Sequence, residues 1–139
     1  MSNSVTTRFL DSNIFVYVMM DDPSYSGKAL RILPRIEEGK EQGWTSTLAL
    51  SQAFSHLKKR KKYQAVDRFY DFLEGNPIRV TETTREDMVN ARASKQAQNV
   101  QWNMWDDLVI ASQMRRLEIS EIYSNDTDFD KLKGLTRFF

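Results

Sequence analysis

Apolar and polar residues alternate along the chain in short blocks, and these blocks predict strands that are each followed by a helix. Short apolar runs bounded by turn-forming residues indicate buried strands, whereas apolar residues at helical spacing indicate amphipathic helices. These signals predict strands at residues 6–10, 43–46, 77–81 and 119–124, and a final edge strand at 136–139. Strands that alternate with helices are typical of a parallel sheet covered on both faces, so the predicted fold class is α/β.

The segments between the predicted strands carry the helical pattern. We predict helices directly after Asp11, over residues 28–41, over 48–57, over 63–73, from residue 84, and from the acidic pair at 106–107. Pro34 is expected to kink or shorten its helix, because proline lacks the amide hydrogen that an interior helical position donates. Asp21 and Asp22 stand beside Pro23 in a turn-rich break and are expected to be loop acids.

Composition limits the domain count and the kinds of site. With 139 residues, of which 40% are hydrophobic and 28% charged, the chain is expected to form one domain over residues 1–139. It contains no cysteine, which excludes disulfides and thiolate ligands, so oxygen atoms would have to hold any metal. The N-terminus lacks a signal-peptide pattern, and no apolar run approaches the roughly 18 residues of a membrane span. We therefore expect a cytoplasmic protein without membrane contact.

Acidic residues interrupt or follow the apolar blocks at three places. Asp11 follows the first predicted strand, the pair Asp106 and Asp107 opens a buried helix, and Asp126 and Asp128 follow the last long strand. Asp11 and one of the pair Asp106 and Asp107 have a simpler interpretation, because aspartate at a helix start bonds free amide hydrogens and complements the helix dipole. If the three places meet at the carboxyl edge of one sheet, their like charges require a cation, and the sequence then predicts a divalent metal site.

The residues around these acids resemble the motifs of a known family. Three segments are similar in order and spacing to the acidic motifs of PIN domains and, within that family, of the small VapC-type toxins: Leu10-Asp11-Ser12-Asn13, Asp107-Leu108-Val109-Ile110-Ala111 and Ser124-Asn125-Asp126-Thr127-Asp128-Phe129. The resemblance covers nearly the whole chain. It implies an α/β/α sandwich with a central parallel sheet of four to five strands, whose carboxyl edge gathers the acids, binds Mg²⁺ or Mn²⁺ and hydrolyses RNA.

The same resemblance implies roles for individual residues. The implied metal ligands are four aspartates, of which the last orients water or binds a second ion: Asp11, Asp107, Asp126 and Asp128. The implied hydrogen-bond partners of these carboxylates are Ser12, Asn13 and Ser124. Of the pair Asp106 and Asp107, the family motif aligns Asp107 with the metal ligand. Asp106 is the alternative ligand.

The chain departs from the family pattern at Gln52. VapC-type proteins carry a fourth catalytic acid, normally a glutamate, in a pattern like Thr-Ser-x-x-x-x-Ser-Glu, and residues 45–52 match it with Gln52 in place of the acid. An amide removes one negative charge, so the resemblance implies weakened metal binding and impaired cleavage. Gln52 is either a natural departure or an introduced change. Without the family pattern it would be an ordinary surface amide of a helix.

The resemblance also implies partners. These are an RNA substrate, a VapB-type antitoxin whose tail fills the acidic groove, and a second copy of the chain in a homodimer. The main alternative is a PIN-like RNA- or protein-binding module without catalysis, which Gln52 makes credible. A phosphotransfer enzyme of the haloacid-dehalogenase kind is a weaker rival, because that motif requires an acid two residues after the nucleophilic aspartate and this chain has Asn13 there.

Net charge does not decide the partner, because a formal charge of +1 is too small to indicate nucleic acid by itself. A basic block of five consecutive cations would contact RNA phosphates or be the solvated end of a helix: Lys58, Lys59, Arg60, Lys61 and Lys62. Trp102, Met104 and Trp105 would stack on bases or pack in the core. His56 is the only histidine, so histidine catalysis is not expected.

Overall fold

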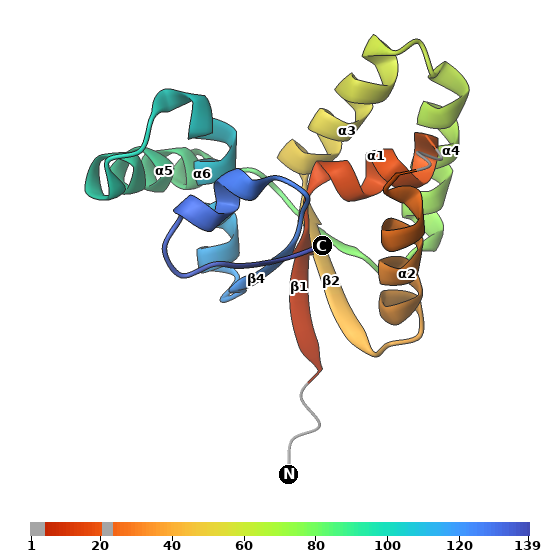
Figure 1. Cartoon of the computed structure of the whole chain (residues 1–139), viewed down its shortest axis with the longest axis horizontal. Helices are drawn as coiled ribbons and strands as arrows, with labels where there is room; N and C mark the ends of the chain where they lie inside the picture. Colours follow the sequence, from red (N-terminus) through yellow and green to blue (C-terminus); the bar gives the residue numbers. More distant parts are fainter. Residues whose placement is uncertain (1–4, 21–23) are drawn as a thin grey trace.

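The computed structural model describes residues 5–20 and 24–139 of the chain (Figure 1). Within these residues the strands are β1 (Thr6–Leu10), β2 (Glu41–Ser46), β3 (Arg79–Thr81), β4 (Glu121–Tyr123) and β5 (Thr136–Phe138). The α-helices are α1 (Ser12–Met20), α2 (Ser26–Glu37), α3 (Thr47–Lys59), α4 (Tyr63–Gly75), α5 (Arg85–Gln98) and α6 (Trp105–Arg116), and the short 3₁₀ helices are η1 (Trp102–Met104) and η2 (Thr127–Lys131). The predicted loop acids Asp21 and Asp22 lie outside the described residues.

The strands form one parallel sheet in the order β3-β2-β1-β4-β5. The chain adds β2 and β3 on one side of β1, and then returns to the other side to add β4 and β5. The boundary between β1 and β4 is therefore the point where the strand order reverses, and open α/β sheets bind their ligands at this point, beyond the carboxyl ends of the strands. Leu10 and Tyr123 lie opposite each other at these two carboxyl ends.

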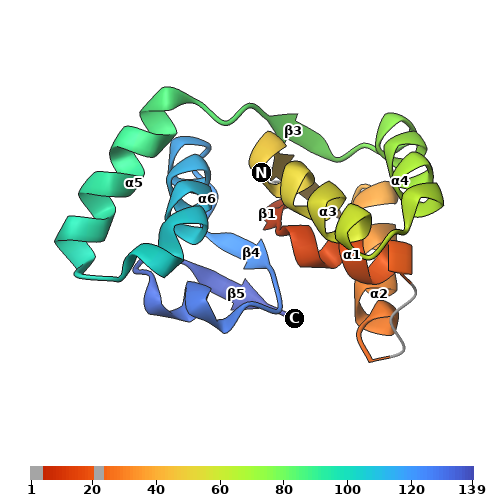
Figure 2. The same ribbon diagram turned by 90° about the horizontal axis from the view of Figure 1, so that it is seen from above.

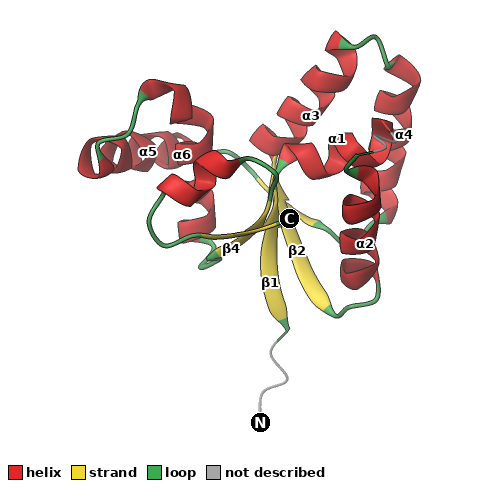
Figure 3. Cartoon of the chain, in the orientation of Figure 1, coloured by secondary structure: helices red, strands yellow, loops and turns green. Residues whose placement is uncertain are grey.

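Helices cover both faces of the sheet (Figure 2, Figure 3). Because successive strand residues point to opposite faces, Leu10 and Tyr123 pack with α1 to α4 in one core, and Phe9 and Ile122 pack with α5 and α6 in the other. Strands that are buried on both faces have consecutive apolar residues, which is the pattern that predicts them from sequence. The observed layers confirm the predicted α/β/α sandwich with a parallel sheet.

The observed strands match the predicted ones in order but differ at their ends. β2 begins at Glu41 rather than at residue 43, because the buried Glu41 side chain pairs with Arg8 of β1 (3.3 Å). β3 begins at residue 79 rather than 77, since the Ile78 amide donates to Asn76 Oδ1 (3.1 Å) in a turn. β4 begins at residue 121 rather than 119, since the amide of Ile119 still bonds to a carbonyl of α6 (2.8 Å).

α2 ends at a glycine turn and not at its proline. Pro34 lies inside the helix, which continues to Glu37, four residues short of the predicted end at residue 41. Gly39 then takes a left-handed conformation with φ of 75°, and the amide of Lys40 bonds to Arg35 O (2.8 Å). This turn directs the chain into β2. Among the residues that the structure describes, no helix is both long and apolar enough to cross a membrane.

Candidate metal centre

The carboxyl ends of β1 and β4 bring together two segments that are far apart in sequence. Asp11 directly follows β1, and Ser124 directly follows β4. The amide of Asp11 donates to Tyr123 O (3.0 Å), which extends the pairing of the two strands by one bond. Asp11 and Ser124 are both buried, with 5% and 0% of their surface exposed. The switch point of the sheet therefore places a buried carboxylate beside a buried hydroxyl.

The carboxylate of Asp11 is held by three donors. Oδ1 accepts from the Ser12 amide (2.8 Å), and Oδ2 accepts from Ser124 Oγ (2.7 Å) and Asn13 Nδ2 (3.2 Å). Burial raises the pKa of Asp11 to about 6, the bonds from Ser124 and Ser12 oppose this rise, and the nearby charge of Asp126 adds to it. Asp11 therefore bonds the first amide of α1, as the capping interpretation expects, and its charge also interacts with that of Asp126.

Ser124 links the two segments through several hydrogen bonds. Its hydroxyl donates to Asp11 and accepts from the Asp126 amide (3.0 Å) and from Asn13 Nδ2 (3.2 Å). Its carbonyl accepts from Arg137 Nη1 (3.1 Å) on β5. Asn13 Oδ1 in turn accepts from the Asn125 amide (3.2 Å). The predicted neighbours Ser12, Asn13 and Ser124 thus all lie around the Asp11 carboxylate.

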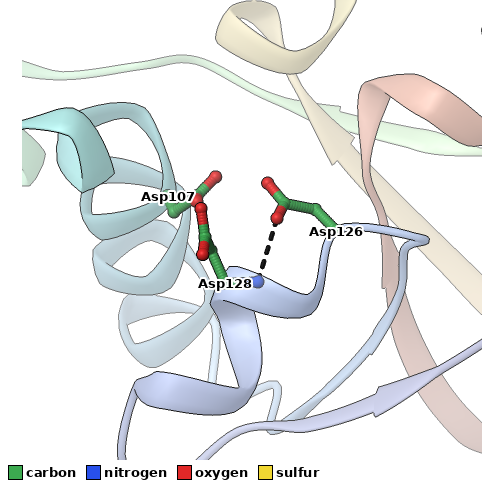
Figure 4. Close-up of side chains that lie close together, drawn as sticks. All are labelled: Asp107, Asp126 and Asp128. Carbon is green, nitrogen blue, oxygen red and sulfur yellow. Dashed lines mark hydrogen bonds between the residues drawn. The ribbon is translucent and has the colours of Figure 1, made fainter.

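Three further carboxylates point toward one another (Figure 4). Asp107 comes from the first turn of α6, Asp126 precedes η2, and Asp128 lies within η2. One carboxylate oxygen from each of the three lies within 4.8 Å of the others. The amide of Asp128 donates to Asp126 Oδ1 (2.9 Å), which fixes this turn. We call Asp107, Asp126 and Asp128 the acidic triad, and the triad together with Asp11 the acidic site.

The acidic triad has the electrostatics of a cation site. Burial raises the pKa of Asp107 to about 8, with further contributions from the charges of Asp126, Asp11 and Asp128. Lys131 Nζ bonds to Asp128 Oδ1 (2.9 Å). Because the Lys131 side chain is 65% exposed, water screens the charge of this ion pair. Clustered carboxylate oxygens are the ligands that Mg²⁺ and Mn²⁺ prefer. The residues present therefore fit a divalent cation.

Asp106 and Gln52 form a separate contact next to the acidic triad. Gln52 Nε2 on α3 donates to Asp106 Oδ2 (2.8 Å). Asp106 is exposed and lies outside the acidic triad. The interpretation of Asp106 or Asp107 as the N-cap is wrong, because α6 is preceded by Met104 and both acids lie inside its first turn. η1 runs directly into α6, so α6 begins at Trp105, one residue before Asp106.

The basic block is exposed, whereas most of the tryptophan segment packs in a core. The block runs from the last turn of α3 into the loop before α4, and its five side chains are exposed. Met104 is buried, and Trp105 packs partly buried against the same core, as the packing interpretation predicts. Trp102 is 62% exposed, and Lys95 Nζ lies 4.7 Å from its ring centre.

The sequence pattern does not predict two cations that the structure brings to the site. Lys131 follows Asp128 by three residues in η2. This spacing indicates an ion pair only when the segment is known to be helical. Arg137 reaches Ser124 O and also pairs with Asp130 (3.0 Å) from β5. No local pattern indicates the Arg137 contact, because it depends on the pairing of β4 with β5.

The fold and the site together define a doubly wound parallel α/β protein with a carboxylate cluster at its switch point. The chain belongs to the PIN domain family, whose model matches residues 8–135. No curated protein sequence gives a significant match. The family assignment confirms the resemblance that the acidic motifs suggest.

Solved structures of VapC proteins and of toxin–antitoxin complexes share this fold at low sequence identity. VapC20 of Mycobacterium tuberculosis, a sarcin-ricin loop cleaving toxin, has 19% identity and a TM-score of 0.74, with 90% of this chain and 93% of that chain covered. VapBC2 from Rickettsia felis, bound to a fragment of its promoter DNA, has 17% identity and a TM-score of 0.70, with 96% and 98% covered. A toxin–antitoxin complex from Klebsiella pneumoniae has 17% identity and a TM-score of 0.66, with 93% and 95% covered.

Proposed function

We propose that this chain is a VapC-type toxin that hydrolyses RNA phosphodiester bonds with the help of a divalent metal ion. The observation that carries the proposal is the acidic triad at the switch point of a PIN-domain chain. The similarity to VapC20, a toxin that cleaves the sarcin-ricin loop, supports RNA as the substrate class. PIN nucleases generally depend on divalent metals, and the triad offers the oxygen ligands that such ions need.

Four aspartates would hold Mg²⁺ or Mn²⁺: Asp11, Asp107, Asp126 and Asp128. When bound, such an ion lowers the pKa of water and neutralises charge that develops on the phosphate. Ser124, Ser12 and Asn13 keep the Asp11 carboxylate in one orientation through their hydrogen bonds. These residues thereby fix a carboxylate at the place where the scissile phosphate would arrive.

We also propose a VapB-type antitoxin and a second copy of the chain as partners. The similar structures from Rickettsia felis and Klebsiella pneumoniae are VapBC or toxin–antitoxin assemblies, and they cover nearly the whole of this chain. A third, VapBC-1 from Haemophilus influenzae, covers 96% of this chain. The homodimer rests on the family resemblance.

The alternative function is an RNA- or protein-binding module that does not cleave. The observation that favours it is Gln52, which donates to Asp106 with the amide that a glutamate would lack. An intact acidic triad favours cleavage over this alternative, because a pure binding module has no need of clustered carboxylates that repel RNA phosphates.

Cleavage of an end-labelled RNA in Mn²⁺, with and without chelator, tests the proposal. Asp126→Asn removes one carboxylate of the acidic triad, and we expect it to lower the cleavage rate by about 100-fold or more. Asp71→Asn is the matched control, because Asp71 is an exposed residue of α4, a helix that contributes no residue to the triad. We expect this control to stay within about 3-fold of the unmodified protein.

Two results would contradict the nuclease proposal. One is cleavage that persists in Asp126→Asn at the control rate. The other is an unmodified protein that binds Mn²⁺ and RNA but leaves the RNA intact, which would make the binding module the correct function.

A further inference from the structure

A groove lies between α1 and α3, next to the acidic site. The two helices lie side by side on the same face of the sheet (Figure 1, Figure 2). The groove has a volume of about 490 Å³, within the usual size range of ligand pockets. Its lining includes Asn13, Tyr17, Met20, Gln52, His56 and Arg60. One end of the groove is thus formed by residues that contact the acidic site, and the other end by Arg60.

The lining residues lie on facing stripes of the two helices. Gln52, His56 and Arg60 follow one another at four-residue spacing, so they share one face at the α3 side over about 12 Å. Asn13, Tyr17 and Met20 share the facing side of α1, at spacings of four and three residues. At one end of the α3 stripe Gln52 contacts Asp106, and at the other end lies the guanidinium group of Arg60.

Tyr17 gives the groove a fixed aromatic wall. Its hydroxyl accepts from Asn125 Nδ2 (3.0 Å), the residue directly before Asp126. Its ring centre lies 4.8 Å from that of Tyr25 and 5.6 Å from that of Phe139. These contacts hold the ring in place while part of the side chain still lines the groove. A fixed aromatic side chain and an arginine in one groove can together recognise a nucleotide. The aromatic ring contacts the base or sugar, and the arginine contacts the phosphate.

The position of Arg60 distinguishes it from the other residues of the basic block. Arg60 lines the α1–α3 groove, whereas Lys58 lines a different groove between α3 and α4. RNA carries a negative charge on every nucleotide and is repelled by the acidic triad, so binding needs a cation placed a short distance along the strand. The sequence alone treats the five cations as equivalent, and the structure separates them.

We propose that the α1–α3 groove binds the nucleotide next to the scissile phosphate of a single-stranded RNA, with Arg60 and His56 contacting its phosphate and Tyr17 its base or sugar. The proposal rests on the proposed function, because that function makes RNA the ligand. It adds the direction in which the strand leaves the acidic site, which is along α3 toward the basic block. Arg60 and His56 are binding residues in this scheme and take no part in bond breaking.

Steady-state cleavage of a labelled RNA in Mn²⁺ tests the groove. We expect Arg60→Gln to raise KM by about 5- to 10-fold and to leave kcat within about 2-fold, because it removes one phosphate contact. The slope of log KM against log salt should also fall by about 0.7, the value for one contact to a single strand. Arg68→Gln is the matched control, since Arg68 is an exposed arginine on α4 that lines none of these grooves. Equal melting temperatures of the two variants would show that both fold.

Binding without cleavage separates this proposal from the nuclease proposal. Fluorescence anisotropy with the same RNA is measured in the Asp126→Asn background, with Arg60→Gln or Arg68→Gln added. A Kd that rises about 5- to 10-fold only with Arg60→Gln supports the groove even if the unmodified protein cleaves nothing. Cleavage by the unmodified protein together with equal Kd values overturns the groove and leaves the nuclease intact.

Two other results also overturn the groove proposal. An equal rise of KM in Lys58→Gln would mean that the basic block acts only as diffuse charge. Binding of a hexaglutamate peptide that requires Arg60, without a matching effect on RNA, would make the groove a site for an acidic protein segment.

Discussion

At the scale of single residues, Gln52 stands where the resemblance to VapC-type proteins leads us to expect a glutamate. Its neutral amide donates a hydrogen bond to Asp106 Oδ2 at 2.8 Å. A glutamate at this position would instead place a second negative charge beside Asp106. The amide therefore satisfies Asp106 without a cation. An acid at this position would instead create a second place that attracts positive charge, next to the acidic triad.

We predict that Gln52→Glu raises Mn²⁺ affinity by about 5- to 10-fold and raises the RNA cleavage rate with it, because it adds one carboxylate beside Asp106. Isothermal titration calorimetry gives the affinity. Ser51→Glu is the matched control, because it adds the same charge one position earlier on α3, at an exposed residue that lines the α3–α4 groove. An equal gain in both variants would mean that only net charge matters, and no gain in either would mean that residue 52 lies outside the metal site.

The acids of the site are visible in the sequence because each one breaks an apolar pattern. Asp11 and Asp126 follow buried strands, and Asp107 precedes a run of apolar residues. Lys131 and Tyr17 give no such signal, because a lysine in a turn and a tyrosine on a helix are ordinary there. Their place at the site depends on η2 and on the packing of α1 against α3, which only the tertiary structure provides.

At the scale of elements, one buried ion pair joins the start of α5 to the end of α6. Arg116 Nε and Nη2 donate to Asp87 Oδ1 and Oδ2, both at 2.9 Å, and the Asp87 side chain is 1% exposed. Asp87 also forms a capping box with Thr84, with bonds of 2.9 and 3.1 Å. Burial by itself would raise the pKa of Asp87, but the bonds from Arg116 and Thr84 outweigh it and lower that pKa.

We predict that Asp87→Asn lowers the free energy of unfolding by about 2–3 kcal/mol at neutral pH, since it removes a cap and leaves Arg116 without its partner. Because the pKa of Asp87 is lowered in the folded state, this contribution is complete above about pH 4 and disappears as the pH falls through the folded pKa. Urea unfolding of both proteins across this range should show the difference shrinking only at acid pH. Asp130→Asn is the control, because Asp130 pairs with Arg137 at 3.0 Å but is 52% exposed, and its effect should be much smaller.

The elements themselves could be predicted from sequence more reliably than their ends. The apolar runs give the strands, and helical spacing gives the helices between them. The ends depend on polar contacts that the pattern does not contain, such as the pairing of Glu41 with Arg8 that lengthens β2. The N-cap role considered for one of Asp106 and Asp107 is wrong for the same reason, since η1 moves the start of α6 one residue ahead of them, but both acids lie in the first turn, where they complement the helix dipole.

At the scale of the whole molecule, the parallel topology directs the carboxyl ends of all strands to one edge and thereby concentrates acids there. Burial and like charges raise the pKa of Asp107 to about 8 and that of Asp11 to about 6. A carboxyl whose pKa is raised on folding binds protons more tightly in the folded state. Its effect on stability is absent below about pH 4 and becomes increasingly unfavourable as the pH rises toward the folded pKa. A bound cation would remove this penalty, so we expect cation binding and global stability to be linked.

We predict that Asp107→Asn stabilises the metal-free protein near pH 8 by about 1–2 kcal/mol, and that this gain vanishes near pH 4. Thermal unfolding in chelator, at several pH values, measures it. Saturating Mn²⁺ should reverse the order, because ligand at about 100 times its Kd stabilises the unmodified protein by roughly 2.7 kcal/mol and the variant binds it weakly. Asp106→Asn controls for the loss of one charge at the adjacent position and should keep the Mn²⁺ effect. If Asp107→Asn and Asp106→Asn behave alike in both conditions, the acidic triad is not the metal site, because the link between folding and cation binding would not depend on the residue at its centre.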